Sequence, residues 1–182
     1  MIDLYHHGSS VCAAKVRFAL SEKEIPWQGH YLDIHKGYQF APDYIKLNPK
    51  AVVVTPQWRE RRRELVTLGF DAPALGAQYR LYDSYLDMME RALADQLWLA
   101  ADTFSLADIA MTPYVNRLDM LGWPQMWEQT RPRVTAWFER IKARPTFKPA
   151  LLDWCPPDLT AGLSTFGRQS WPSVERLLAD AI

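Results

Sequence analysis

The stretch AVVVTPQWRERRREL, residues 51–65, most constrains the fold of this chain, because two kinds of sequence meet in it. Four β-favouring residues run into a proline and then, with almost no turn, into a charged segment of helical character. Short strand and helix patterns alternate before this stretch, whereas only helical patterns follow it. We therefore expect two domains, a small α/β domain over residues 1–57 and an all-helical domain over residues 58–182.

The composition excludes several classes of protein. Hydrophobic residues make up 48% of the chain and charged residues 23%, as in ordinary globular domains. Basic and acidic residues balance at 21 each, which predicts binding to neither nucleic acid nor a charged membrane. The polar start MIDLYHHGSS and the lack of any long apolar run predict neither a signal peptide nor a membrane span. With only Cys12 and Cys155, a disulfide is not expected, and we predict a cytoplasmic protein.

Residues 1–54 show the pattern strand, helix, strand, helix, strand. The strands are expected at MIDLYHH, at WQGHYLDI (residues 27–34) and at AVVV (residues 51–54). Between them, an apolar stripe predicts a helix from Val11 to about Glu24, and residues 42–47 predict a short one. This order is typical of an α/β layer fold.

Ser10 is the residue in this part with the clearest chemistry. Its hydroxyl is placed to cap the helix that follows, where free amides and the helix dipole favour an anion such as a thiolate. The alternative is that Ser10 is a cap and nothing more. Cys12 lies in the first turn, where it is either a reactive thiol or, as we expect, a small buried hydrophobic residue. His6 and His7 face opposite sides of a strand, and we predict no metal site.

The second part of the sequence reads as a series of amphipathic helices. The first, from Arg59 to Leu68, has the alternating charges of a solvated face. The next is expected to begin at Asp71 as its N-cap, with an apolar stripe formed by Leu75, Tyr79, Tyr82, Leu86, Met89 and Leu93. Ser105 and Asp108 then form a capping-box pattern, and the chain is expected to end in a short helix over residues 173–182.

Three segments resemble the glutathione S-transferase family. SSVCAAKVRFALSEKEIPW (residues 9–27) is similar to the first-helix motif of its serine-type, zeta- and tau-like classes, and HKGYQFAPDYIKLNPKAVV (residues 35–53) to the segment that follows. FSLADIAMTPYVNRL (residues 104–118) is similar to the capping-box helix of the helical domain. The resemblance implies a thioredoxin-like domain, here truncated to about three strands, followed by the helical domain of that family.

The resemblance also implies an activity and its site. A glutathione transferase conjugates glutathione to a small hydrophobic electrophile, often in detoxification, and Ser10 matches the serine that stabilises the thiolate. Residues that match glutathione contacts, or their neighbours, are Ser9, Cys12, Lys36, Gln39 and Val53. Tyr79, Tyr82 and Tyr114, with Trp154 or Trp171, are candidates for lining the electrophile site. Ser105 and Asp108 match the structural cap, with Asp108 buried.

The sequence departs from the family at the junction. Val54 stands where the family has a cis-proline, and the nearest proline is Pro56. Only sixteen positions separate Val54 from Asp71, whereas a further strand and helix with their turns need about 25. The pair that would hold the γ-glutamyl group, Glu-Ser or Gln-Ser, is missing there, and the helices of the usual homodimer interface are incomplete. The alternative function is therefore a non-catalytic scaffold or protein-binding module, and a third hypothesis is a redox protein that uses Cys12.

Overall fold

The computed structural model describes residues 1–34, 36–49 and 56–179, and it begins with a two-stranded sheet. β1 (Ile2–His6) and β2 (Trp27–Tyr31) pair in parallel, in a register that runs from Ile2 opposite Trp27 to His6 opposite Tyr31. α1 (Val11–Glu22) connects them, and the turn η1 (Tyr38–Phe40) and α2 (Pro42–Leu47) follow. These elements agree with the expected pattern, while the expected third strand, residues 51–54, lies outside the described residues.

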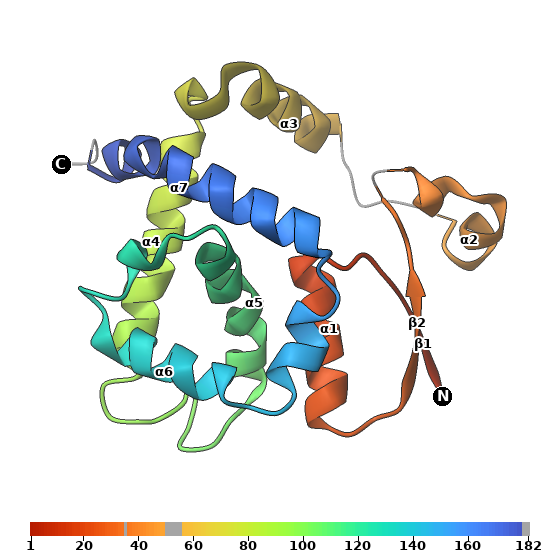
Figure 1. Cartoon of the computed structure of the whole chain (residues 1–182), viewed down its shortest axis with the longest axis horizontal. Coiled ribbons are helices and arrows are strands. Elements are labelled where there is room, and N and C mark those ends of the chain that lie inside the picture. Colours follow the sequence, from red (N-terminus) through yellow and green to blue (C-terminus); the bar gives the residue numbers. More distant parts are fainter. Residues whose placement is uncertain (35, 50–55, 180–182) are drawn as a thin grey trace.

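The rest of the described chain is helical. Its elements are α3 (Pro56–Leu68), η2 (Gly69–Asp71), α4 (Leu75–Ala92), α5 (Leu106–Met120), η3 (Pro124–Met126), α6 (Pro132–Lys142), the π-helical turn η4 (Lys148–Leu152) and α7 (Pro157–Ala179). α1 lies between the sheet and this helical domain, and α7 crosses above α4 and α5 in the view of Figure 1. The architecture is that of a truncated thioredoxin-like domain followed by a transferase-type helical domain.

Two expected helix boundaries were wrong. Asp71 caps nothing, since it belongs to η2 and α4 begins at Leu75 without a side-chain cap. The C-terminal residues form one helix of 23 residues rather than a short final one. Pro172 lies inside it, although a proline removes one helical hydrogen bond. At Gly167 an added Cβ would lie 1.8 Å from the carbonyl oxygen of Leu121, so only glycine permits this approach.

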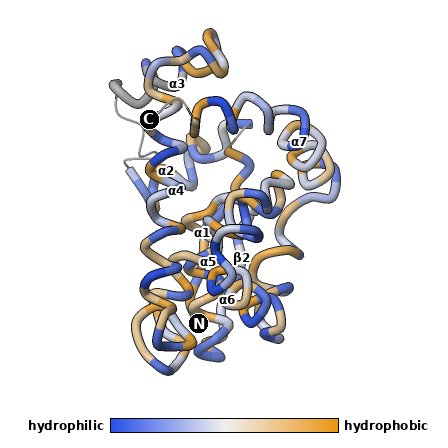
Figure 2. The backbone as a smooth tube through the Cα atoms, turned by 90° about the vertical axis from the view of Figure 1, so that its left-hand side faces the viewer, coloured by the Kyte–Doolittle hydropathy of each residue, from blue (hydrophilic) through white to orange (hydrophobic). Residues whose placement is uncertain are grey.

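The helical domain holds the main hydrophobic core. Side chains that are almost fully buried come from α4, α5, α6 and α7, among them Leu86, Val115, Trp137, Phe138, Ile141 and Val174. Hydrophilic and hydrophobic segments alternate along these helices in Figure 2, as expected for helices that bury one face each. No helix among the described residues is both long and apolar enough to cross a bilayer.

The start of α5 is the best-defined polar element of that core. Ser105 and Asp108 form the expected capping box, and Asp108 is fully buried. The Asp108 carboxylate accepts hydrogen bonds from the amides of Leu99 and Ser105 at 3.0 and 2.9 Å and from Trp137 Nε1 at 2.8 Å. One side chain therefore joins the loop before α5, the helix itself and α6.

Candidate functional site

The turn between β1 and α1 carries the two candidate serines. Ser10 has extended backbone angles, and its Oγ accepts a hydrogen bond from the Ala13 amide at 3.2 Å, so it is the N-cap of α1. Ser9 Oγ lies 2.9 Å from His7 Nδ1. Both serines are half-buried. The cap leaves the remaining amides of the first turn, at the positive end of the helix dipole, next to Ser10.

Two arginines hold the carbonyl groups of this turn. Arg17 is fully buried and donates to the carbonyl oxygens of Gly8 and Ala150 at 3.1 and 2.8 Å. Arg117, from α5, donates to the carbonyl oxygen of Ser9 at 2.6 Å. Within the described ranges neither guanidinium forms an ion pair with a carboxylate. The end of α1 is therefore positive, with no acid to neutralise it.

Burial shifts the pKa values of two groups next to this turn, His6 and Arg17. Burial lowers the pKa of Arg17 to about 10, and burial followed by the charge of Arg17 lowers the pKa of His6 to about 4. His6 is consequently neutral at pH 7. Because a guanidinium only donates, His6 Nδ1 must accept the hydrogen bond from Arg17, 3.2 Å away, and the proton of the ring sits on Nε2. Sequence reasoning missed this pair, although Arg17 stands inside the V-R-x-A-L motif.

The other candidate glutathione contacts are not gathered around Ser10. Cys12 is exposed, which corrects the expectation of a buried residue, because the first turn of α1 points it to solvent. Lys36 pairs with Asp33 at 3.6 Å, and Gln39 lies in η1, on the opposite side of the sheet from α1 in Figure 1. Val53 lies outside the described residues.

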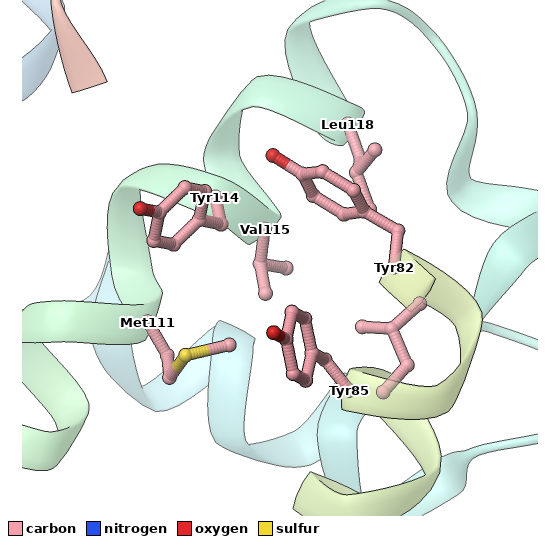
Figure 3. Close-up of a pocket in the computed structure, with 7 residues that line it drawn as sticks. Tyr82, Tyr85, Met111, Tyr114, Val115 and Leu118 are labelled. Atoms are coloured by element: carbon pink, nitrogen blue, oxygen red, sulfur yellow. The ribbon is translucent and has the colours of Figure 1, made fainter. Parts of the chain in front are cut away.

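Two hollows border α5. The smaller one, of about 20 Å³, is lined by Ser9, Ser10, Arg17, Arg117 and Cys155, among others, and has room for about one water molecule. The larger one, of about 290 Å³, opens between α4 and α5. Its lining is mostly apolar and consists of Tyr82, Tyr85 and Leu86 from α4 and Met111, Tyr114, Val115 and Leu118 from α5, as Figure 3 shows.

The larger hollow, called the α4–α5 cavity below, receives two of the three expected tyrosines. Tyr82 and Tyr114 meet edge to face in it, with ring centres 6.0 Å apart. Tyr79 lies outside it, edge-on to Trp123 in the core at 5.8 Å. Tyr85 was missed, although its spacing of three residues from Tyr82 places both on one face of α4.

The two tryptophans suggested for the lining have other surroundings. Trp171 packs against Trp123 with ring centres 6.4 Å apart. Trp154 lies on the sheet, 4.5 Å from the His6 ring and 5.5 Å from Trp27 between ring centres. Neither lines the α4–α5 cavity. Their partners lie far away in the sequence, so local patterns did not indicate these contacts.

Among the described residues no cluster of histidine, cysteine, aspartate and glutamate could hold a metal ion. Cys12 and Cys155 are both free thiols.

Comparison with known proteins finds a family model that matches part of the helical domain and relatives that align with most of the chain. The family model "Glutathione S-transferase, C-terminal domain" matches residues 56–140. The chain is 22% identical to the tetrachloro-p-hydroquinone reductive dehalogenase of Sphingobium chlorophenolicum, over 82% of this chain and 95% of that protein. It is 24% identical to the disulfide-bond oxidoreductase YfcG of Escherichia coli, over 84% of this chain and 95% of that protein.

The solved structures share the fold. A glutathione transferase family member from Pseudomonas fluorescens, determined with two glutathione bound, superposes with a TM-score of 0.64 at 14% identity. The superposition covers 81% of this chain and 91% of that one. These matches, with the order of elements, support a glutathione S-transferase family protein with a truncated thioredoxin-like domain.

Proposed function

We propose that the protein conjugates glutathione to a small hydrophobic electrophile, with Ser10 stabilising the glutathione thiolate. The observation that carries the proposal is the N-terminus of α1. It combines a serine hydroxyl, free amides and two arginines that pair with no carboxylate among the described residues. Such an environment stabilises a thiolate without requiring a general base.

The reaction follows from these groups. The glutathione thiol loses its proton to solvent, and the Ser10 hydroxyl can donate a hydrogen bond to the thiolate sulfur while its oxygen still accepts from the Ala13 amide. The sulfur attacks the electrophilic carbon, a C–S bond forms, and the leaving group departs with the bonding electrons. Holding both reactants in place supplies the remaining rate enhancement. This reaction belongs in the cytoplasm, where glutathione is kept reduced.

The α4–α5 cavity is our candidate for the electrophile site. Its apolar lining suits a hydrophobic ring, and Tyr82 and Tyr114 supply aromatic edges. One relative is named for reductive dehalogenation of a chlorinated hydroquinone, so halogenated aromatics are the first electrophiles to screen.

A non-catalytic role is the second candidate function. Two expected glutathione contacts have no counterpart in the sequence, and the N-terminal part exposes large apolar side chains: Ile2, Tyr31, Tyr38, Phe40 and Leu47. Such a surface suits a protein partner. On this view the chain is a transferase-derived binding module.

Calorimetric titration with glutathione distinguishes the two functions. We expect saturable binding that Ser10→Ala weakens about tenfold, which corresponds to the loss of one hydrogen bond to a charged group. Ser10→Asp is the sharper variant, since aspartate caps a helix as well as serine but places a negative charge beside the thiolate. It should abolish binding and leave the melting temperature unchanged. The absence of any heat at millimolar glutathione, in protein shown to be folded, would reject the enzymatic proposal.

A further inference from the structure

A third cavity, of about 350 Å³, lies near the C-terminal end of α7. There α7 meets η2 and the start of α4, and Figure 1 shows the ends of these helices side by side. The lining includes Phe70, Asp71, Gly76, Arg80, Arg176 and Leu177. The hollow at Ser10 lies at the other end of α7, where Cys155 precedes the helix, and the two share no lining residue. This cavity, called the η2–α7 cavity below, is therefore a separate site.

Two guanidinium groups line the η2–α7 cavity, and neither is closely paired with an acid. Arg80 donates from Nη1 to the carbonyl oxygen of Leu177 at 3.3 Å and forms no ion pair in the part of the chain that the structure describes. Arg176 lies 3.8 Å from Asp71, whose side chain is 87% exposed. A long, solvated ion pair of this kind contributes little free energy. Two cations at one cavity repel each other, so the cavity favours an anion.

The backbone of α4 and the apolar walls add to this character. α4 begins at Leu75 without a side-chain cap or an acidic residue in its first turn, and Gly76 of that turn lines the cavity. The first amides of a helix have no acceptor within it and carry the positive end of its dipole. An added Cβ at Gly76 would lie 3.0 Å from Arg80 Nη1, so the glycine leaves space for the guanidinium. Phe70 and Leu177 supply apolar surface.

A phosphate group suits these arginines better than a carboxylate does. A guanidinium can bind either group through two parallel hydrogen bonds. A phosphomonoester, however, carries nearly two negative charges at pH 7 and three acceptor oxygens, which is enough for both arginines at once. A single carboxylate would offer Arg176 only what Asp71 already offers. The volume of about 350 Å³ is in the range of small-molecule sites and leaves room for an organic group beside the phosphate.

We propose that the η2–α7 cavity binds a compact organic phosphate, a phosphomonoester of a small molecule. The phosphate oxygens accept hydrogen bonds from Arg80 and Arg176, and they take the place of Asp71 beside Arg176. The organic group contacts Phe70 and Leu177. This site does not depend on the proposed function, because none of its lining residues belongs to the turn at Ser10 or to the α4–α5 cavity.

Phenyl phosphate and benzoate are the probes, since they share a ring and differ in the anionic group. Calorimetric titration of the whole chain at pH 7 should show phenyl phosphate binding at least about tenfold more tightly, the value of one charge-assisted hydrogen bond. Arg176→Met should weaken phenyl phosphate about tenfold for the same reason. Arg168→Met is the matched control, because Arg168 is exposed on the same helix and does not line the cavity. It should leave the affinity unchanged.

Asp71→Asn separates an effect on the site from an effect on folding. It removes the acid that lines the cavity, and the exposed Asp71 side chain makes no other ion pair among the described residues. Phenyl phosphate should then bind about threefold more tightly, since a weak competing pair is lost. A damaged fold would not produce a gain in affinity.

Several results would overturn the proposal. They are no heat with phenyl phosphate at millimolar concentration, equal affinities for phenyl phosphate and benzoate, and equal weakening by Arg176→Met and Arg168→Met. Ser10→Ala, which tests the proposed function, should leave phenyl phosphate binding unchanged. If Ser10→Ala weakened phenyl phosphate as much as Arg176→Met does, the phosphate would bind at the turn of Ser10 instead.

Discussion

The N-terminal part and the helical domain differ in the source of their buried residues. The core of the helical domain consists mainly of its own side chains, from its helices and the turns between them, with Ala14 and Phe18 of α1 added to it. In the described N-terminal part, the buried apolar residues are Ala14, Phe18 and Leu20, all on α1, and β1, β2 and α2 contribute none. The comparison shows that a sheet domain that has lost strands and a helix does not retain a core of its own. Its order depends on the surface against which α1 packs.

The helical domain supplies the contacts that the N-terminal part lacks. Arg17 donates to the Ala150 carbonyl, and Trp154 covers the sheet beside His6. An added Cβ at Gly29 would lie 3.1 Å from Trp154, so the indole rests directly on the strand. At the other end of α1, Glu22 accepts from Arg144 Nε at 2.8 Å. Residues from the C-terminal third of the chain thus replace part of the missing domain.

The largest loss of stability is expected when a buried hydrogen-bonding group of the helical domain is removed. Asp108→Ala removes the carboxylate and leaves the amides of Leu99 and Ser105 and the indole N–H of Trp137 without their acceptor. We expect a loss of about 4 kcal/mol in the free energy of unfolding, measured by urea titration. Both parts should unfold in one transition, because the N-terminal part has nothing else to pack against.

Asp95→Ala is the matched control, since Asp95 is exposed in the loop before α5. It should leave the urea midpoint unchanged. If the sheet kept its protection from hydrogen exchange in Asp108→Ala while the helices lost theirs, the N-terminal part would be an independent domain and the comparison would be wrong.

A smaller loss of stability is expected on acidification, through His6 and its contact with Arg17. The pKa of His6 is lowered to about 4 in the folded protein, so between pH 6.5 and pH 4 the unfolded chain binds a proton that the folded chain does not. Stability should therefore fall as the pH falls through this window, by roughly 3 kcal/mol in total from this group. Urea titrations at pH 7 and pH 4 measure the loss.

His6→Asn isolates this contribution. Asparagine can place its Oδ1 where Nδ1 accepts from Arg17, and it does not titrate. The variant should lose less stability on acidification than the wild type, while other groups such as Glu22, whose pKa is lowered by Arg144, still contribute. An identical pH dependence in both proteins would contradict the buried neutral histidine.

The smallest loss of stability is expected for a substitution that affects the N-terminal part and leaves the helical domain unchanged. Trp154→Ala uncovers the sheet, and we expect a loss of about 2 kcal/mol, less than for a fully buried tryptophan because this one is half-buried. Hydrogen exchange should become faster in β1 and β2 and stay unchanged in α4 to α6. Trp171→Ala is the matched control, since Trp171 is also half-buried but packs against Trp123. Its effect should fall on the helical domain first, and the same exchange pattern in both variants would refute the division.

Features of the chain that depend on residues close together in the sequence were predicted correctly. The N-cap at Ser10, the capping box of Ser105 and Asp108 and the stripe of α4 were all predicted, because each depends on residues three or four positions apart. The end of the chain was misjudged for the opposite reason. Pro172 predicts a break locally, but α7 runs through it, and its earlier residue Gly167 contacts Leu121 and accepts a hydrogen bond from Trp123, both distant in the sequence.

The sequence by itself determined the order of the elements, the truncation at residues 51–65 and the resemblance to a family, since these are properties of local patterns. Only the tertiary structure decided which side chains surround the candidate site. Arg17 meets Ala150 across 133 positions, Lys15 meets Tyr114 across 99, and Arg117 meets Ser9 across 108. A periodic pattern indicates which face of a helix is buried but not which distant helix covers it. The charge around Ser10 and the apolar lining of the α4–α5 cavity are therefore properties of the folded chain.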